Sequence, residues 1–205
     1  MVASVAFNPF VTTNAAGLFL AQFDGLWQGS FMDDPAIRNS LAGGTLASTE
    51  TLPMFAGVGI FEKVSATGAA VTGNTVGRAT SQASTSTGLT GFSVSNQQIN
   101  GLSSPQSPVP QLASGMGVNF FRLNSGARIV LAIDPTIVAS IETGLITQQV
   151  SWDYTNQKIV AYDTVAALPI KIIQVQAPAR TVSYNSGTGV ATWLDTGNAC
   201  ALVQI

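Results

Sequence analysis

From Leu145 onwards, apolar and polar residues alternate with the period of two that is typical of β-strands. The segment "VSWDYTNQKIVAY" over 150–162 reads like "VSYNSGTGVATW" over 182–193, because each begins Val-Ser-aromatic and returns through an apolar run to an aromatic residue. Small polar residues and glycines between the runs supply turn conformations. The pattern therefore predicts β-hairpins in both segments, with further strands at 168–176 and 199–205.

The middle of the chain shows the strand pattern in a less regular form. Apolar runs predict strands within 53–64 and 88–94, and "GVNFFRLNSGARIVLAID" over 117–134 predicts a hairpin around an Asn-Ser-Gly turn. Three prolines in 103–112 exclude a central strand there, because proline cannot donate to a strand ladder. We expect an extended connection in that segment.

Two segments carry the start and stop signals of helices. In 34–43, an aspartate provides a suitable N-cap, a proline lies in the first turn and two glycines follow. In 135–143 the same order recurs, with Asp134 as the N-cap and Gly144 as the stop signal. We therefore expect two short helices, at about 34–43 and 135–143.

Many short strands, separated by turn signals at intervals of about ten residues, favour a sandwich or a barrel. Parallel βαβ units would require regular intervening helices, which the pattern does not show. We expect a mainly β domain over 33–205, an antiparallel β-sandwich or barrel of jelly-roll-like arrangement. Residues 65–90, rich in Ser, Thr, Ala and Gly, fit either a mobile loop or Thr-rich strands at a sheet edge.

Residues 1–32 are interpreted as an N-terminal extended arm with an aromatic face. Aromatic residues recur every four positions at Phe19, Phe23, Trp27 and Phe31, a spacing that fits one face of a helix or of a strand. Glycines among them weaken a helix and favour the extended form. The aromatic side chains can fill the protein's own core or contact a neighbouring subunit. The candidate partner-contact residues are Phe7, Phe10, Phe19, Phe23, Trp27 and Phe31.

The most unusual property of the composition is its low content of charged residues. Only 9% of the residues are Asp, Glu, Lys or Arg, against about 25% in an average domain, although 46% are hydrophobic. Uncharged polar and small residues must therefore cover the surface. Such a surface is tolerated best where neighbouring subunits bury part of it. Assembly with other subunits is therefore expected.

The same composition excludes several classes of partner. Basic residues do not cluster, so the electrostatic footprint of nucleic-acid binding is missing. No run approaches the ~18 apolar residues of a membrane-spanning helix, so we expect no membrane partner. The first basic residue is Arg38, so we expect no secretory signal. The single cysteine, Cys200, is expected to be a small core residue in a reducing cytoplasm.

The sequence offers little for catalysis. It contains no histidine, which removes the usual general base near neutral pH, Ser-His triads and most zinc sites. Phosphate-binding and dinucleotide-binding glycine motifs are also missing. Asp24, Asp33 and Asp34 form a weak carboxylate cluster, with spacing wider than that of a calcium loop. We therefore expect no catalytic, cofactor-binding or metal-binding residues, and no cofactor.

Four longer phrases stand out by their style and order: "DDPAIRNSLAGGTLASTETLPMFAGVGI", "LTGFSV", "SPQSPVPQLASGMGVNFFRLNSGARIVLAI" and "GLITQQVSWDYTNQKIVAYD". Together they resemble the structural cement, or decoration, proteins of tailed bacteriophages, over about residues 30–165. The resemblance implies a small, non-enzymatic, β-rich virion protein that binds the outside of an assembled capsid. It also implies that the protein clamps neighbouring major capsid subunits, and it offers no active-site residues to carry over.

The resemblance also implies partners and a location. Some relatives adopt jelly-roll-like sandwiches and sit as dimers or trimers on symmetry axes. The expected partners are therefore the major capsid protein and further copies of this chain. The expected location is the capsid exterior of the virion, after synthesis in the cytoplasm of the host bacterium. The alternatives are a tail-tube, head-joining or minor shell protein and, less favoured, a glycan hydrolase with two carboxylates roughly 5–10 Å apart.

Overall fold

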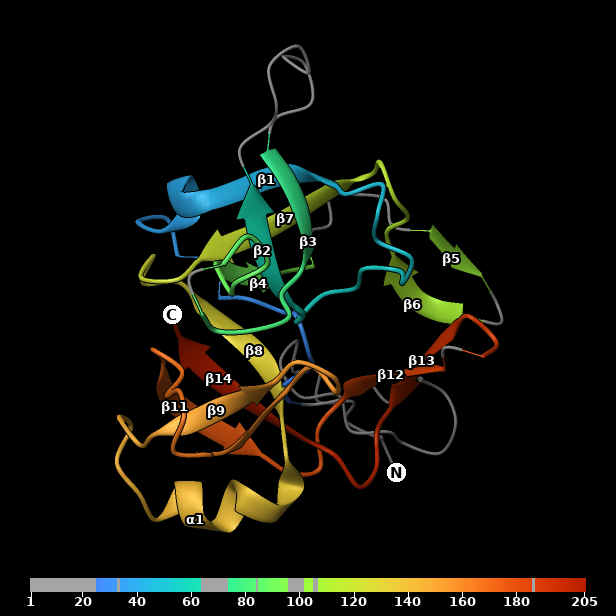
Figure 1. The fold of residues 1–205 in the computed structure, drawn as a ribbon. Coiled ribbons are helices and arrows are strands. Elements are labelled where there is room, and N and C mark those ends of the chain that lie inside the picture. Colours follow the sequence, from blue (N-terminus) through green and yellow to red (C-terminus); the bar gives the residue numbers. More distant parts are fainter. Residues whose placement is uncertain are drawn as a thin grey trace, which may run out of the picture.

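A computed structural model describes residues 25–32, 34–63, 74–83, 85–95, 102–104, 107–185 and 187–205. The fold is mainly β, with a closed barrel, a five-stranded sheet and two two-stranded sheets (Figure 1). The helical segments are η1 (Arg38–Ser40), η2 (Pro135–Ile137) and α1 (Val138–Glu142). The strands are β1 (Leu41–Leu46), β2 (Gly59–Lys63), β3 (Asn74–Arg78), β4 (Gly91–Ser93), β5 (Leu102–Ser104), β6 (Ser107–Gln111), β7 (Gly117–Arg122), β8 (Arg128–Ile133), β9 (Val150–Asp153), β10 (Lys158–Ala161), β11 (Lys171–Gln176), β12 (Thr181–Asn185), β13 (Val190–Leu194) and β14 (Ala199–Gln204).

Strands β1, β3, β2, β4 and β7 close into a barrel in this order. β1 runs parallel to β3, and the other neighbouring strands are antiparallel. Closing only five strands brings backbones close together: a Cβ on Gly91 would lie 2.2 Å from the carbonyl oxygen of Phe121. Buried apolar side chains fill the barrel, among them Ile60, Val76 and Phe120.

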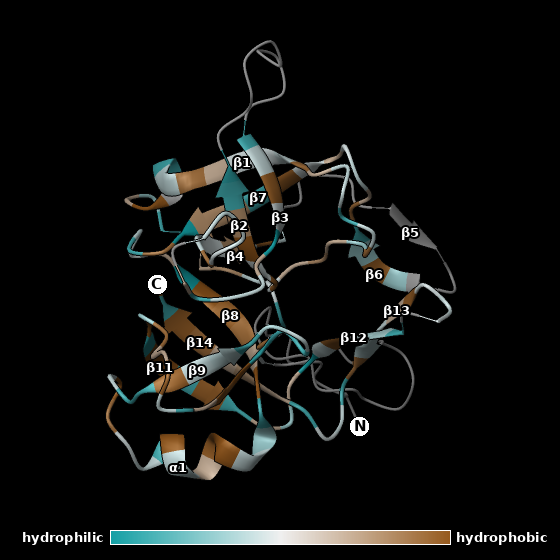
Figure 2. Ribbon diagram, in the orientation of Figure 1, coloured by the Kyte–Doolittle hydropathy of each residue, from teal (hydrophilic) through white to brown (hydrophobic). Residues whose placement is uncertain are grey.

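The five-stranded sheet has the order β11-β14-β8-β10-β9. β8 pairs parallel with β10, and the other pairs are antiparallel. The central strands β8 and β14 are apolar over most of their length, as the brown colour in Figure 2 shows. Helix α1 lies below this sheet in Figure 1 and packs near β11. The strand order makes β11 and β9 the edge strands of the sheet.

Residues 26–32 run between the main parts of the fold and join them by backbone hydrogen bonds. The N–H of Gln28 donates to the carbonyl oxygen of Arg180 at 2.9 Å, next to β12. Gly29 donates to Val130 of β8 at 2.8 Å, and its own carbonyl oxygen accepts from Ser95 at 2.9 Å. This short segment therefore connects the five-stranded sheet, the β12 strand and the chain that follows barrel strand β4.

The expected mainly β fold with a barrel is confirmed, although the parallel β1–β3 and β8–β10 pairs make both sheets mixed. The two hairpins with similar sequences are also confirmed, because β9 pairs with β10 and β12 pairs with β13 in antiparallel registers. Strands β11 and β14 lie in the two segments, 168–176 and 199–205, where strands are predicted.

The hairpin expected at 117–134 is wrong, although both of its strands and its turn exist. β7 belongs to the barrel, where β1 and β4 occupy its two edges. No edge of β7 is therefore left for β8, which pairs with β14 and β10 instead. Asn124 and Gly126 adopt positive φ angles of 64° and 78° in the connection that carries the chain from the barrel to the other sheet.

The helix expected at 135–143 is present as η2 continued by α1, with the Asp134 carboxylate accepting from Thr136 N–H as its cap. The helix expected at 34–43 is wrong. Only the short η1 forms there, and the following residues belong to β1, which pairs with β7 and β3. Gly44 does not stop a helix; it lies in β1, where a Cβ would come 2.4 Å from Val76.

Two further expectations concern segments of unusual composition. Within 65–90, residues 74–78 form the barrel strand β3, and residues 64–73 lie outside the described residues. The proline-rich segment 103–112 is extended and pairs as β5 with β6 in a separate two-stranded sheet, so it contributes no central strand. Such a position tolerates proline, because proline has no N–H to donate and few ladder hydrogen bonds are needed there.

Candidate docking surface

Exposed apolar side chains gather along edge strand β11 and the loop that follows α1. β11 pairs with β14 on one side only. On its other side, the N–H of Ile172 donates to the carbonyl oxygen of Ile146 at 2.9 Å. This bond holds the loop that follows α1 against the outer edge of β11.

The loop owes its position to the short helix before it. α1 buries Val138 and Ile141 against the core, which fixes the direction of the chain at its end. Gly144 then donates its N–H to the carbonyl oxygen of Ile141 at 3.0 Å and turns the chain towards β11. As a result, Leu145 and Ile146 follow the turn with their side chains in solvent.

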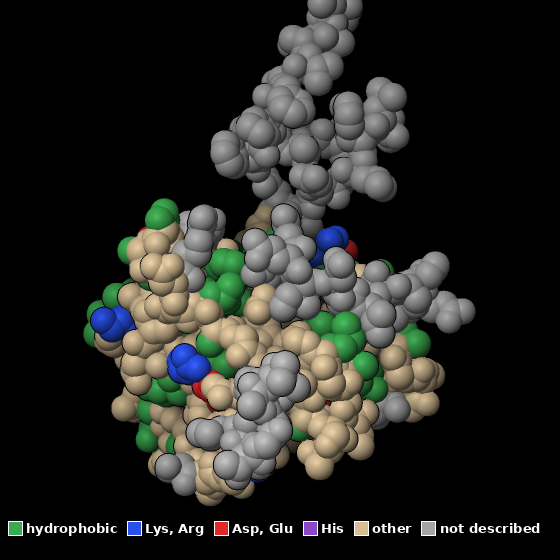
Figure 3. Space-filling view, turned by 90° about the horizontal axis from the view of Figure 1, so that it is seen from above, with side chains coloured by type: hydrophobic (Ala, Val, Ile, Leu, Met, Phe, Trp, Pro, Cys, Tyr) green, Lys and Arg blue, Asp and Glu red, His purple; other side chains and the backbone are tan. Residues whose placement is uncertain are grey.

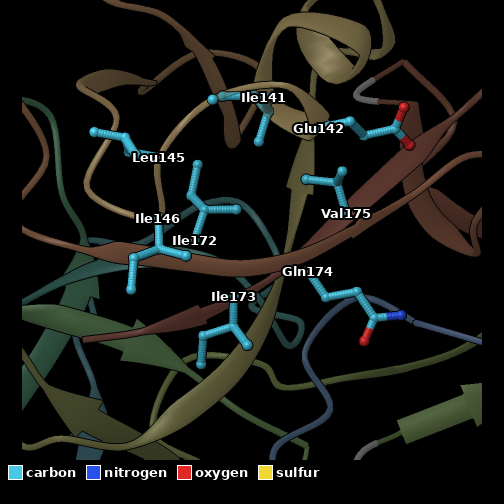
Figure 4. Close-up of a pocket in the computed structure, with 9 residues that line it drawn as sticks. Ile141, Glu142, Leu145, Ile146, Ile172, Ile173, Gln174 and Val175 are labelled. Atoms are coloured by element: carbon cyan, nitrogen blue, oxygen red, sulfur yellow. The ribbon is translucent and has the colours of Figure 1, made fainter.

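Three large apolar side chains are exposed at this place. Leu145 is 78% exposed, Ile146 57% and Ile173 40%. They border a hollow of 260 Å³ between the end of α1 and β11, in which Leu145, Ile146 and Ile172 lie on one side and Glu142 and Val175 on the other (Figure 4). We call this hollow the β11 groove; its lining residues are Ile141, Glu142, Gly144, Leu145, Ile146, Ile172, Ile173, Gln174 and Val175.

A second hollow of 390 Å³ continues from the same loop and strand. Its lining includes Thr147, which follows Ile146, and Lys171, which precedes Ile172. The C-terminal residue Ile205 and Gln204 of β14 also line it. The two hollows therefore both border β11 and the loop that follows α1.

Charge is sparse along this surface. The β11 groove contains one ionisable side chain, Glu142, and the second hollow contains one, Lys171. Figure 3 shows, from above, another face whose described side chains are mostly uncharged, with few Lys, Arg, Asp or Glu. An apolar partner would therefore meet little charge to desolvate in the β11 groove.

Several carboxylates elsewhere hold the fold through ion pairs. Asp134 lies 2.7 Å from Lys158, and Asp195 lies 2.6 Å from Arg180. Two further acids are engaged in the same way: Glu62 pairs with Arg122, and Glu50 lies near Arg78. The hydrogen bond from Arg122 lowers the pKa of Glu62, and burial lowers the pKa of Arg78. These four acids make structural ion pairs, and they do not line a common cleft.

The carboxylates considered from the sequence are not brought together by any described contact. Asp24 and Asp33 lie outside the described residues, and Asp34 accepts a hydrogen bond from the N–H of Ala36 at 2.9 Å. Within the described ranges, no group of three or more His, Cys, Asp or Glu residues lies close enough to hold a metal ion. Among the helices of the described chain, none is both long and apolar enough to span a membrane.

Two of the six candidate partner-contact residues are described. Phe31 is partly buried against the main core and meets Phe121 edge to face at 5.5 Å between ring centroids. Trp27 is exposed and meets Trp193 edge to face at 6.1 Å. Both aromatic rings thus have partners within their own chain. Phe7, Phe10, Phe19 and Phe23 lie outside the described residues.

The residues of the β11 groove were not among the candidates chosen from the sequence. A signal was present, because Leu145 and Ile146 form an apolar pair between a helix-terminating glycine and the polar run 147–149. The local pattern shows no core in which an apolar pair at such a turn could be buried. The sequence did not show that β11 would pass beside it.

Comparisons with protein-family models, with curated proteins and with solved structures find no match for this chain. The fold and the surface therefore define its class: a mainly β protein with a closed five-stranded barrel and an apolar groove at a sheet edge.

Proposed function

We propose that the protein is a non-enzymatic structural component of a virion. It binds the outer surface of an assembled capsid through the β11 groove and stabilises contacts between major capsid subunits. The observation that carries the proposal is the exposure of Ile173 in edge strand β11, and of Leu145 and Ile146 in the loop beside it, in a protein with only 9% charged residues. The resemblance of the sequence to phage decoration proteins supports the same assignment.

An edge strand with exposed apolar side chains is a physical basis for attachment. The backbone groups of an edge strand can pair with a strand of another chain, and neighbouring apolar pockets add specificity. Burying one Leu or Ile side chain fully contributes about 1.5–3 kcal/mol. Contacts of this kind are less sensitive to salt than ion pairs, which suits a particle exposed to variable media.

Binding at several equivalent sites at once strengthens a contact that is weak at a single site. If copies of this chain assemble as dimers or trimers, each assembly engages several capsid subunits at once, and the second contact forms at a high effective concentration. The proposed partners are accordingly the major capsid protein and further copies of the same chain, at the capsid exterior.

The proposal is tested with purified shells assembled without this protein. Wild-type protein should bind the shells and raise the fraction that survives heating. The double variant Leu145→Ser/Ile173→Ser should bind at least about 10-fold more weakly, because it removes two apolar contacts of the groove. The matched control is Val165→Ser, since Val165 is 84% exposed but does not line the groove. Failure of the wild-type protein to bind or protect shells would refute the proposal.

A second candidate is a tail-tube, head-joining or minor shell protein. The position of β11 at a sheet edge favours it as well, because an edge strand can pair with another copy and continue a ring or tube. A tube-forming protein should assemble alone at high concentration, and a capsid-binding protein should require the shell. Sedimentation of the purified chain over a range of concentrations separates the two.

A further inference from the structure

A short extended segment around Trp27 lies beside the β12–β13 hairpin and widens it. Trp27 forms a parallel bridge with Arg180, the residue before β12. Arg180 in turn lies opposite Asp195, one position beyond the paired residues Thr181 and Leu194 of the hairpin. Side chains at paired positions of neighbouring strands point to the same face. Trp27, Arg180 and Asp195 therefore form one row across three neighbouring segments.

The side chains of this row contact one another and the ring of Trp193. Arg180 donates from Nε and Nη2 to the two carboxylate oxygens of Asp195, at 2.6 and 3.2 Å. Its guanidinium lies 5.9 Å from the centroid of the Trp193 ring, and Trp27 meets the same ring edge to face at 6.1 Å. These contacts hold the polar groups and the rings in fixed relative positions. We call the set of Trp27, Arg180, Trp193 and Asp195 the Trp27 platform.

The Trp27 platform is open to solvent. Trp27 is 39% exposed, and the side chains of Arg180 and Asp195 are 33% and 44% exposed. Two of the three tryptophans of the chain belong to the platform, whereas the third, Trp152, is buried. An exposed tryptophan leaves a large apolar area in water, and tryptophan beside arginine is the composition of binding contacts. The platform is therefore a candidate ligand site.

The balance of charge on the platform selects the class of ligand. Arg180 and Asp195 neutralise each other, so an anionic ligand would meet no net positive charge there. An apolar peptide would take the same ion pair out of water without replacing its hydrogen bonds, which is costly. A pyranose sugar avoids both problems, because its C–H face stacks on an aromatic ring and its hydroxyl groups both donate and accept. The Asp195 carboxylate can accept about four hydrogen bonds, and Arg180 supplies two of them.

We propose that the Trp27 platform binds a neutral, β-linked oligosaccharide of glucose or N-acetylglucosamine. The ring substituents of these sugars are equatorial, so the flat face of one ring is apolar and stacks on Trp27. Hydroxyl groups at the edge of the ring donate to Asp195. In Figure 1, β12 and β13 lie on the right and β11 lies on the left, so the platform is separate from the β11 groove. The proposal therefore does not depend on capsid binding.

A nuclear magnetic resonance titration of the free, full-length protein with cellohexaose and with chitohexaose tests the proposal. The three indole N–H signals are separate reporters. Those of Trp27 and Trp193 should shift with a dissociation constant of about 1 mM or tighter, and that of buried Trp152 should not. The affinity should change little with added salt, because the ligand is neutral. Absence of these shifts with both sugars at about 10 mM, or equal shifts of all three signals, would overturn the proposal.

Variants on the two faces of the hairpin locate the binding. Trp27→Ala should weaken binding at least about 10-fold, because it removes the stacking surface. Asp195→Asn keeps the shape but removes the charged acceptor, and should weaken binding several-fold. The matched control is Leu194→Ala, since Leu194 is 40% exposed but points to the opposite face of β13 from Trp193. It should bind as the wild type does.

The dispersion of the amide signals shows whether each variant is folded. Unchanged binding in folded Trp27→Ala, or an equal loss in Leu194→Ala, would refute the assignment of the sugar to the Trp27 platform. Because no shell is present, these results are independent of the outcome for capsid binding.

Discussion

The side-chain oxygen of Gln28 accepts a hydrogen bond from the backbone N–H of Val182 at 2.9 Å. The Nε2 group of the same side chain donates to the carbonyl oxygen of Gly57 at 3.4 Å, and Gln28 is 2% exposed. One buried amide thus joins strand β12 to the chain that enters barrel strand β2. Gln28 and Val182 are 154 residues apart in sequence, so this contact ties the ends of the fold together.

Replacement of Gln28 by alanine should be strongly destabilising. The change leaves the N–H of Val182 and the carbonyl oxygen of Gly57 without their side-chain partner in a buried place, and it removes packing volume. We expect a loss of about 2–4 kcal/mol in the free energy of unfolding, measured by urea denaturation. The matched control is Gln174→Ala at an exposed position, which should cost less than about 1 kcal/mol. Similar losses in both variants would contradict the assigned role of Gln28.

The Asp134 carboxylate both caps η2 and pairs with Lys158 of β10. Hydrogen bonds from Lys158 and Thr136 lower its pKa from 3.8 to about 2. Asp134→Ala removes the cap and the ion pair, and should cost about 1–2 kcal/mol near neutral pH. Asp134→Asn keeps a capping oxygen and should cost less. Urea denaturation of both variants measures the difference.

The pH dependence of the same site follows from the direction of the pKa shift. Because the folded protein holds the Asp134 pKa below its ordinary value, the ionised carboxylate contributes stability above pH 3.8. That contribution should disappear as the pH falls towards about 2. The stability difference between wild type and Asp134→Asn should therefore shrink over this interval. A difference that stays constant down to the lower pH would show that the ionised form of Asp134 is not favoured by folding.

The hairpins were predictable because their determinants are local. In the first, the Asp153 carboxylate accepts from the backbone N–H groups of Thr155 and Asn156 at 2.8 and 2.9 Å. In the second, the Asn185 side chain accepts from Gly187 at 2.9 Å. Such turns depend on residues two or three positions apart, so they can be predicted from a short stretch of sequence.

Long-range pairing limited the remaining predictions. The apolar run in β8 predicts a strand, but its partner β14 lies about seventy residues later, where no local signal connects the two. The segment after Asp34 carries real helix signals, yet pairing of Leu41 with Phe121 gives it backbone partners in the barrel and overrides the local preference. Helix propensity is thus a weak guide where a closed barrel supplies a strand to pair with on each side of the segment.

The sequence predicts that the protein has an apolar contact surface, but it does not predict where such a surface would lie. Low charge predicts a protein that other subunits cover, and the groove supplies apolar surface at a sheet edge. Its position depends on the bond between Ile172 and Ile146, which joins residues from two separate elements. The aromatic pattern instead directed attention to Trp27 and Phe31, whose rings meet partners in their own chain.

Glycine at position 91 should be essential to barrel closure, whereas glycine at 117 should not. A Cβ at Gly91 would lie 2.2 Å from the carbonyl oxygen of Phe121, so Gly91→Ala must push β4 and β7 apart. We expect a loss of at least about 2 kcal/mol in the free energy of unfolding. Gly117 starts strand β7, and a Cβ there would meet no atom within 4 Å, so Gly117→Ala should be tolerated. Equal stability of the two variants by urea denaturation would contradict the close approach of β4 and β7.

The thiol of Cys200 should be unreactive in the folded protein. It is buried in β14, its Sγ donates to the carbonyl oxygen of Arg180 at 3.4 Å, and burial raises its pKa from 9.0 to about 12. Thiol reagents attack the thiolate, so both the raised pKa and the loss of access slow the reaction. Modification by a chromogenic disulfide reagent should be at least about 100-fold slower in native than in urea-unfolded protein. Rapid native labelling would show that β14 opens readily, and would place a mobile strand at the centre of the five-stranded sheet.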